Sequence, residues 1–326
     1  MGSDMRVSLS EVKRARGLIK RGTTLLILIG MFITFSAVSP QFRSVINILN
    51  IFEQNAVIGI IACGMAFMII IGGFDLSVGS VAALTGIVVG IILRDSPNAF
   101  LVAILSGLAI GVGVGLANGL LISKIGINPF VTTLGMMVIA RGLVFVITLG
   151  KPIYGFPMHY NVIGMGKLGP IPIPMLIWGV IVLVAHVLLK YTKFGQYVYA
   201  VGGSETVARL SGINIERMKI LTCVFTGLLA SLGGIVLVFR VMAALPQAAT
   251  GYELTAIAAA VVGGCALGGG AGGVVGTIVG TLVLGVIING LHILGVSAYW
   301  ESAVTGMIIL TAVGIDMVSR KAADKA

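Results

Sequence analysis

Charged side chains are scarce in this sequence. Asp, Glu, Lys and Arg together make up 10% of its 326 residues, whereas soluble globular domains carry about 25%. Apolar side chains account for 58% of the chain, and 47 residues are glycine. This composition excludes an ordinary soluble domain and predicts an all-α integral membrane protein.

The patterns of catalytic, metal and nucleotide sites are also missing. His159, His186 and His292 have neither metal-ligand spacing nor partners for a Ser/His/Asp arrangement. A Gly-x-x-x-x-Gly-Lys-Ser/Thr loop occurs nowhere, so the chain does not bind ATP through a P-loop. We therefore expect no enzyme activity, metal or cofactor in this chain. The energy for any transport must come from another subunit or from an ion gradient.

Cysteine is rare as well. Cys63, Cys223 and Cys265 lie in apolar or glycine-rich runs, and their odd number argues against a disulfide framework. We expect all three to be packing residues.

Long apolar runs, by contrast, are abundant. A membrane-spanning helix needs about 20 mostly apolar residues. On that rule the sequence predicts ten spans, at residues 23–39, 53–71, 76–93, 99–122, 129–149, 172–190, 219–240, 253–268, 273–293 and 298–317. All nine prolines fall between these segments or at their starts, where a missing N–H group is harmless.

Basic residues are unevenly distributed among the predicted loops. If the N-terminus is inside, 15 of the 21 Lys and Arg residues fall in inner loops and ends. Such an excess marks the cytoplasmic side of membrane proteins, so the formal charge of +10 indicates topology rather than nucleic-acid binding. Both termini are predicted to be cytoplasmic.

Two polar, glycine-containing motifs interrupt the apolar runs. The segment GGFDLSVGS (72–80) precedes the third span, and GYELT (251–255) precedes the eighth and matches residues 73–77 class for class. Asn118 in the fourth span has a counterpart in Asn289 in the ninth. An odd offset of five spans means that the two copies cross the membrane in opposite directions. The sequence therefore predicts one transmembrane domain (1–326) with inverted repeats at about 23–149 and 172–317, and short or broken helices at the motifs.

The motif residues have two compatible interpretations. Asp75 and Glu253 are expected to cap the helix starts that follow them. Buried helix starts also form polar sites for small solutes. On the second interpretation these residues line a substrate pathway together with the other polar and aromatic motif positions, which are Phe74, Ser77, Asn118, Tyr252, Thr255 and Asn289.

Two further features lie inside the spans. Arg141 is a cation within the fifth span, so it should meet a carboxylate or backbone carbonyl groups, and structural pairing is favoured over substrate contact. Gly107, Gly111, Gly115 and Gly119 recur every four residues in the fourth span, as in closely packed membrane helices.

The two longest loops differ in character. The outer loop at 151–174 carries five prolines and should be a semi-rigid docking surface. The inner loop contains helix start and stop signals at 202–214, which predict a short cytoplasmic helix that contacts a partner. Its candidate coupling residues are Ser204, Glu205, Val207, Ala208, Arg209, Leu210, Ser211 and Gly212.

Several segments resemble the permease subunits of ribose-type ABC sugar importers. They are GGFDLSVGS (72–80), NPFVTTLGMMVIARG (128–142), GGSETVARLSGINIERMKI (202–220), GYELTAIAAAVVGG (251–264) and NGLHILGVSAYW (289–300). The resemblance implies ten helices per subunit in the bacterial inner membrane and import of a monosaccharide such as ribose or allose. The implied partners are a cytoplasmic ATPase that uses ATP and reads 202–214, a periplasmic sugar-binding protein and a second permease subunit, which we expect to be identical.

Three functions compete at this point: an ABC importer permease, an ion-coupled secondary sugar carrier and a membrane enzyme. Inverted repeats suit both transporters. The short inner helix favours the importer, because a secondary carrier has no ATPase to contact. The enzyme lacks a constellation of acid, base, nucleophile or metal.

Overall fold

The computed structural model describes residues 9–297, 299–300, 303–311 and 314, and it describes side chains from residue 24 onward. The long helices are α1 (Leu9–Val38), α2 (Val45–Ile70), α3 (Val78–Asp95), α4 (Phe100–Leu120), α5 (Pro129–Thr148), α7 (Ile173–Tyr191), α10 (Ile215–Val241) and α12 (Val274–Ile293). The shorter helices are α6 (Val162–Met165), α8 (Lys193–Gly203), α9 (Glu205–Leu210) and α11 (Tyr252–Val262), with a π-helix at Leu121–Ile125 and a 3-10 helix at Met158–Asn161. Strands β1 (Lys167–Leu168) and β2 (Ile171–Pro172) pair as an antiparallel hairpin.

Seven of the described helices are long and apolar enough to cross a membrane, namely α2, α3, α4 with its π-helical extension, α5, α7, α10 and α12. Two shorter apolar stretches lie in α1 and α11. Each of the first nine predicted segments overlaps a helix, and the all-α membrane class is confirmed. The tenth predicted segment, 298–317, lies partly outside the described residues, with 303–311 helical.

Helix α11 is shorter than the sequence predicted. The apolar run suggested a helix over 253–268, but α11 ends at Val262. Gly264 follows in the left-handed conformation (φ 92°), and its N–H group bonds to the Val261 carbonyl oxygen at 2.9 Å. A left-handed glycine after the last turn stops a helix. The helix therefore ends at these glycines, although the apolar run continues beyond them.

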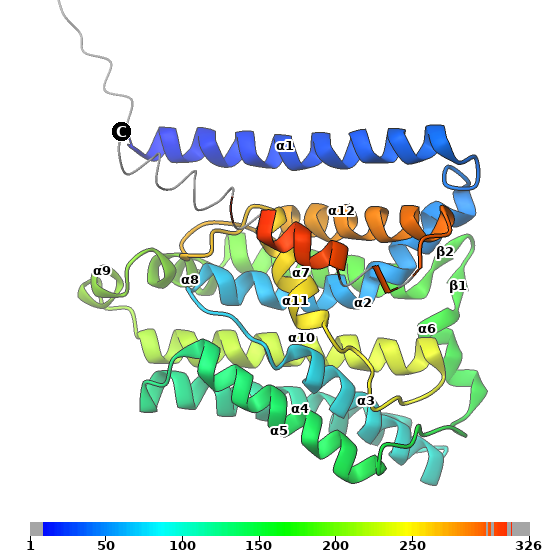
Figure 1. Cartoon of the computed structure of the whole chain (residues 1–326). Coiled ribbons are helices and arrows are strands. Elements are labelled where there is room, and N and C mark those ends of the chain that lie inside the picture. The colour runs from blue at the N-terminus through cyan, green and yellow to red at the C-terminus, as the bar shows by residue number, and fades with distance from the viewer. Residues whose placement is uncertain (1–8, 298, 301–302, 312–313, 315–326) are drawn as a thin grey trace, which may run out of the picture.

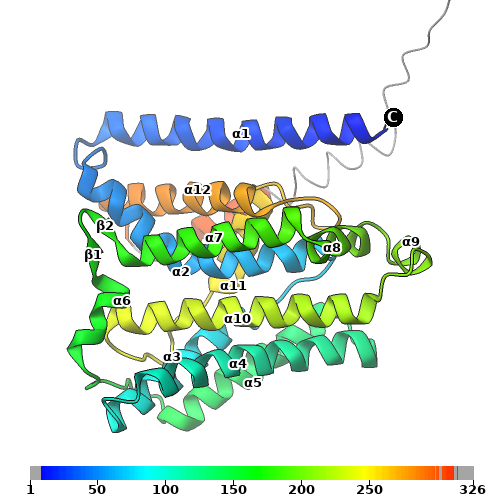
Figure 2. The same cartoon turned by 180° about the vertical axis from the view of Figure 1, so that it is seen from behind.

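The long helices lie side by side between two ends of the molecule (Figure 1). We call the end that carries α8 and α9 the α9 end, and the opposite end, which carries β1 and β2, the hairpin end. Helix α1 packs along α12, and α12 packs against α2. From behind, α7 lies on α2, and α4 lies against α10 with α5 at the edge (Figure 2). Helix α1 begins at the α9 end.

Helix α2 forms the centre of this arrangement. It contacts α7, α10, α11 and α12, and every residue from Gly59 to Ile70 is buried. That stretch is apolar on all sides, so it has no face that suits water and is stable only when enclosed. The neighbouring helices are thereby positioned around one interior.

Glycines bring α4 and α10 into backbone contact. A Cβ atom at Gly111 would collide with the Gly227 carbonyl oxygen, and one at Gly115 would collide with the Cys223 carbonyl oxygen. The packing role predicted for the glycines of the fourth span is confirmed.

Two loops enter the interior from opposite ends and each starts a helix there (Figure 1). Loop 71–77 leaves α2 at the α9 end, where the Ile70 carbonyl oxygen accepts a hydrogen bond from the Gly270 N–H group at 2.8 Å. Loop 242–251 leaves α10 at the hairpin end, where Ala244 forms an antiparallel bridge with Ile153. The first loop leads into α3 and the second into α11, so both polar motifs lie inside the bundle.

Candidate functional site

The first motif is folded into a closed hydrogen-bonded cluster. Asp75 Oδ1 accepts from the Ser77 N–H group at 2.8 Å and from the Ser77 hydroxyl at 2.5 Å. Asn118, on α4, donates its side-chain amide to Ser77 Oγ at 3.1 Å. All three side chains are at most 1% exposed. The structure therefore brings three of the predicted site residues together in the interior.

The capping role expected for Asp75 is wrong in one respect. Helix α3 begins at Val78 with Ser77 as its N-cap, and no side chain makes the cap hydrogen bond there. Asp75 instead closes a turn ahead of the helix, because its carboxylate bonds to the N–H group two residues later. The side chain fixes the loop rather than the helix end.

The second motif begins α11. Gly251 takes the left-handed conformation (φ 82°) as its N-cap, and Tyr252 is the first helical residue. Glu253 lies in the first turn of the helix, with its carboxylate close to the backbone of Gly251 and of its own residue. Thr255 donates its hydroxyl to the Gly251 carbonyl oxygen at 3.1 Å. Here the carboxylate does lie at a helix start, where the helix dipole favours negative charge.

The two motifs meet at Gly79, in the first turn of α3. A Cβ atom on Gly79 would collide with the Glu253 carboxylate and with the Ala249 carbonyl oxygen. Segments at least 170 residues apart in the sequence are thus in direct contact, and only glycine permits this approach. Phe74 is half-buried, and its carbonyl oxygen lies 3.4 Å from the Thr133 hydroxyl.

Asn289 lies apart from this centre. Its side-chain amide exchanges hydrogen bonds of 2.9 and 3.0 Å with the amide of Asn47, near the start of α2. Asn118 bonds to the motif of its own half, whereas Asn289 bonds to a helix of the other half. The two asparagines match in sequence position but differ in their partners.

Arg141 ties α5 to the second loop. Its Nη1 group donates to the Pro246 carbonyl oxygen at 2.8 Å and to the Ala248 carbonyl oxygen at 3.0 Å. Glu253 is also close enough to interact electrostatically with the guanidinium. The sequence left the partner of this cation open, and the structure supplies two backbone carbonyl groups in loop 242–251.

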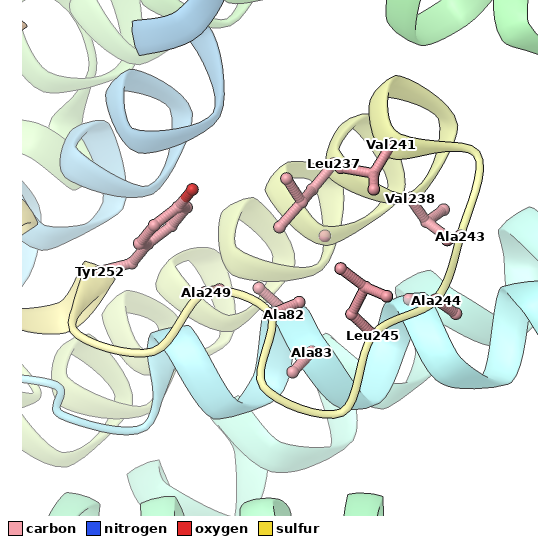
Figure 3. Close-up of a pocket in the computed structure, with 13 residues that line it drawn as sticks. Ala82, Ala83, Leu237, Val238, Val241, Ala243, Ala244, Leu245, Ala249 and Tyr252 are labelled. Atoms are coloured by element: carbon pink, nitrogen blue, oxygen red, sulfur yellow. The ribbon is translucent and has the colours of Figure 1, made fainter. Parts of the chain in front are cut away.

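Each of the two motifs borders a cavity. The hairpin-end cavity, of about 210 Å³, is bounded by α3, α10, loop 242–251 and Tyr252. Figure 3 shows the side chains of Leu237, Val241 and Leu245 around it, with the Tyr252 ring on the far side. The α9-end cavity, of about 120 Å³, is lined by Gly72 and residues of α2, α9 and α10. The first motif borders the α9-end cavity through Gly72 and Gly73, and the second motif borders the hairpin-end cavity through Tyr252.

The predicted coupling segment forms α9, with the expected start and stop. Ser204 is its N-cap and accepts from the Val207 N–H group at 3.3 Å, and Gly212 follows its end in the left-handed conformation. Ala208 is buried, but the Leu210 side chain is 84% exposed. Val207, one turn earlier, is exposed as well.

An ion pair connects α9 to α10. Lys219 Nζ lies 2.7 Å from Glu205 Oε1, and both residues line the α9-end cavity. Arg209 is exposed, as are Ser211 and Gly212. The coupling segment therefore contacts the interior cavity directly through one of its charged residues.

Sequence reasoning missed two local elements near this segment. Helix α8 follows α7 after a single residue, and its start is signalled by Thr192, whose hydroxyl accepts from the Gly195 N–H group at 3.3 Å. The π-helix at the end of α4 carries Lys124, which lies 2.5 Å from Glu216 on α10. A Thr N-cap after a long apolar helix could have revealed α8, whereas no sequence signal marks the π-helix.

Apolar spans around buried polar helix starts, each beside a cavity, are typical of a membrane transport protein. The family described as the permease component of branched-chain amino acid transport systems matches residues 47–313. The chain belongs to this family. It is a multi-pass inner-membrane permease subunit of an ABC importer, not an enzyme or an ion-coupled carrier. Such a permease works with an ATPase and a substrate-binding protein.

The chain is also similar to named curated proteins. It is 43% identical over 297 residues to the ribose import permease protein of Escherichia coli strain K12. The aligned region covers 90% of this chain and 92% of that protein. The Bacillus subtilis ribose import permease is 41% identical over 293 residues, with 88% and 91% covered. The D-allose transport system permease protein of Escherichia coli strain K12 is 35% identical over 289 residues, with 88% of each chain covered. No solved structure matches the chain.

Proposed function

We propose that this permease forms the pathway of a monosaccharide, a pentose such as ribose or a hexose such as allose. The named relatives support the substrate class. The observation that carries the pathway is that each motif borders a cavity, Tyr252 at the hairpin end and Gly72 at the α9 end, while the two motifs are in contact at Gly79. A solute that enters one cavity needs only a rearrangement of these motifs to reach the other.

The motif residues are proposed to line this pathway. Asn118 Oδ1 is buried and accepts no hydrogen bond from the described residues, so it could accept one from a passing hydroxyl when the cluster opens. Tyr252 faces the hairpin-end cavity and offers its ring to the apolar face of a sugar. Phe74, Asp75, Ser77, Glu253 and Thr255 are proposed to line the pathway between the two cavities. Asn289 remains in the proposal through its sequence match alone.

The proposed architecture is a single domain of about ten spans, built as inverted repeats over 23–149 and 172–317. The packing supports two related halves that interlock. Helices α3 and α4 of the first half pack on α10 of the second, while α11 and α12 of the second half pack on α2 of the first. The loops that carry the motifs also enter from opposite ends. The first helices of the two halves do not follow this pattern. Helix α1 packs on α12, whereas its counterpart α7 packs on α2.

The energy is proposed to come from ATP in a partner ATPase that docks on α9, with no cofactor in this chain. Two identical permease subunits are proposed to pair within the lipid. The large exposed apolar side chains of α4 and α5 support burial of these faces against lipid or a second copy.

The function is tested by sugar uptake into vesicles that contain the permease, its ATPase and its binding protein. Uptake of ribose should require ATP, should continue when ion gradients are collapsed and should stop when the binding protein is omitted. Allose and arabinose serve as comparison sugars. Uptake driven by an ion gradient in the absence of ATP would contradict the proposal.

The proposed topology predicts which ends thiol reagents can reach. Arg94, at the end of α3, and Gly203, at the end of α8, are both exposed, and a side chain at Gly203 meets no atom within 4 Å. The native cysteines are buried and give little background. An impermeant thiol reagent outside intact cells should label Arg94→Cys and not Gly203→Cys, and inside-out vesicles should reverse the pattern. Labelling of Gly203→Cys from outside would place α9 in the periplasm.

A further inference from the structure

Gly86 is a glycine that helix packing does not require. It lies in the middle of α3 and is buried, yet a Cβ atom there would meet its nearest neighbours, the Gly234 carbonyl oxygen and Val238 Cβ, at 3.7 Å. That distance is an ordinary van der Waals contact. Glycine weakens a helix interior relative to alanine, so its use here calls for a reason other than close packing.

Gly234, by contrast, is a glycine that helix packing does require. Gly234, on α10 opposite Gly86, could not carry a Cβ atom, because that atom would collide with the Ala82 carbonyl oxygen. Both glycines line the hairpin-end cavity. Gly234 therefore serves the contact between α3 and α10, whereas the open side of Gly86 is the cavity itself.

The hairpin-end cavity is small. Its volume of about 210 Å³ lies below the roughly 300–1,000 Å³ of typical small-molecule sites. The α3 wall consists of Ala82, Ala83 and Gly86, the smallest residues available, while Leu237 and Val238 of α10 form the facing wall. Any side chain placed at Gly86 would project into the remaining space.

We propose that Gly86 is a specificity-determining residue that sets the width of the hairpin-end chamber and hence the size of solute that the permease passes. This inference rests on the proposed sugar pathway. Because the chamber wall at α3 offers no charged group among the described lining residues, it selects by size and leaves recognition of the sugar to other groups.

The test compares Gly86→Ala and Gly86→Leu with the matched variant Gly179→Leu. Gly179 is on α7, is exposed, and has no atom within 4 Å of a Cβ position. In vesicles with ATPase and binding protein, Gly86→Ala should leave membrane abundance and melting temperature unchanged or higher, and should slow ribose uptake about tenfold. Gly86→Leu should abolish uptake, and Gly179→Leu should transport at the normal rate.

A second-site variant separates space from packing. In the Gly86→Leu background, Leu237→Ala removes volume from the facing wall and should restore part of the uptake. The inference is overturned if Gly86→Leu transports ribose normally, or if Gly86→Ala lowers abundance and uptake in parallel. If the unaltered permease takes up none of the tested sugars, the proposed function fails instead, which is a distinct result.

Discussion

Leu210→Asp is expected to release the ATPase from the permease while the chain stays folded and inserted. Leu210 ends α9 with its side chain 84% exposed, and Val207 one turn earlier is 61% exposed. Burial of a leucine side chain contributes about 1.5–3 kcal/mol, so its loss should weaken ATPase binding about ten- to hundredfold. ATP-dependent sugar uptake should fall to background as a consequence.

Co-purification of the ATPase with tagged permease measures this effect, with sugar uptake as the second readout. Leu168→Asp is the matched control, because Leu168 is also an exposed leucine but lies in β1 at the opposite end of the molecule. It should leave ATPase binding unchanged. Normal co-purification and normal uptake in Leu210→Asp would show that α9 is only a solvated surface helix.

Replacement of Arg141 by methionine should remove most sugar uptake. The guanidinium holds two carbonyl groups of loop 242–251, and methionine would leave both without this donor. An unsatisfied buried polar group costs about 1–3 kcal/mol, with the lower end expected because Arg141 is half-buried. The loop bounds the hairpin-end cavity, so its displacement should disturb entry of the solute more than it disturbs folding.

Arg240→Met provides the comparison for Arg141→Met. Arg240 also donates to a backbone carbonyl, that of Gln54 at 3.2 Å, but the contact is exposed and single. We expect near-normal uptake in Arg240→Met, partial uptake in Arg141→Lys and little in Arg141→Met, all at comparable membrane abundance. If Arg141→Met transports as well as Arg240→Met, the clamp on the loop has no role in transport.

Local features of the sequence predicted the helices well. Apolar length identified α2, α4 and α12, and the cap signals of Ser204 and Gly212 located α9, because these properties reside in consecutive residues. The four-residue spacing of the glycines in α4 also predicted their packing role. Where local signals conflict, apolar length predicts the wrong boundary. The apolar run continues past α11, but Gly263 and Gly264 end the helix at Val262.

The partners of polar groups could not be predicted in the same way. Asp75 was expected to cap a helix but fixes a turn, and Asn289 pairs with Asn47, 242 residues away. The pairing of Glu205 with Lys219 likewise depends on how α9 folds back on α10. Such contacts are set by the three-dimensional packing, which one sequence without its relatives does not contain.

The backbone contact between α4 and α10 constrains how the interior can open. Gly111 and Gly227 leave no side-chain layer that could slide or repack, so this pair should behave as one body in any rearrangement. Helix α4 comes from the first half of the chain and α10 from the second. The contact therefore predicts that α4 and α10 move together, in which case the sequence halves are not the mechanical halves of the molecule.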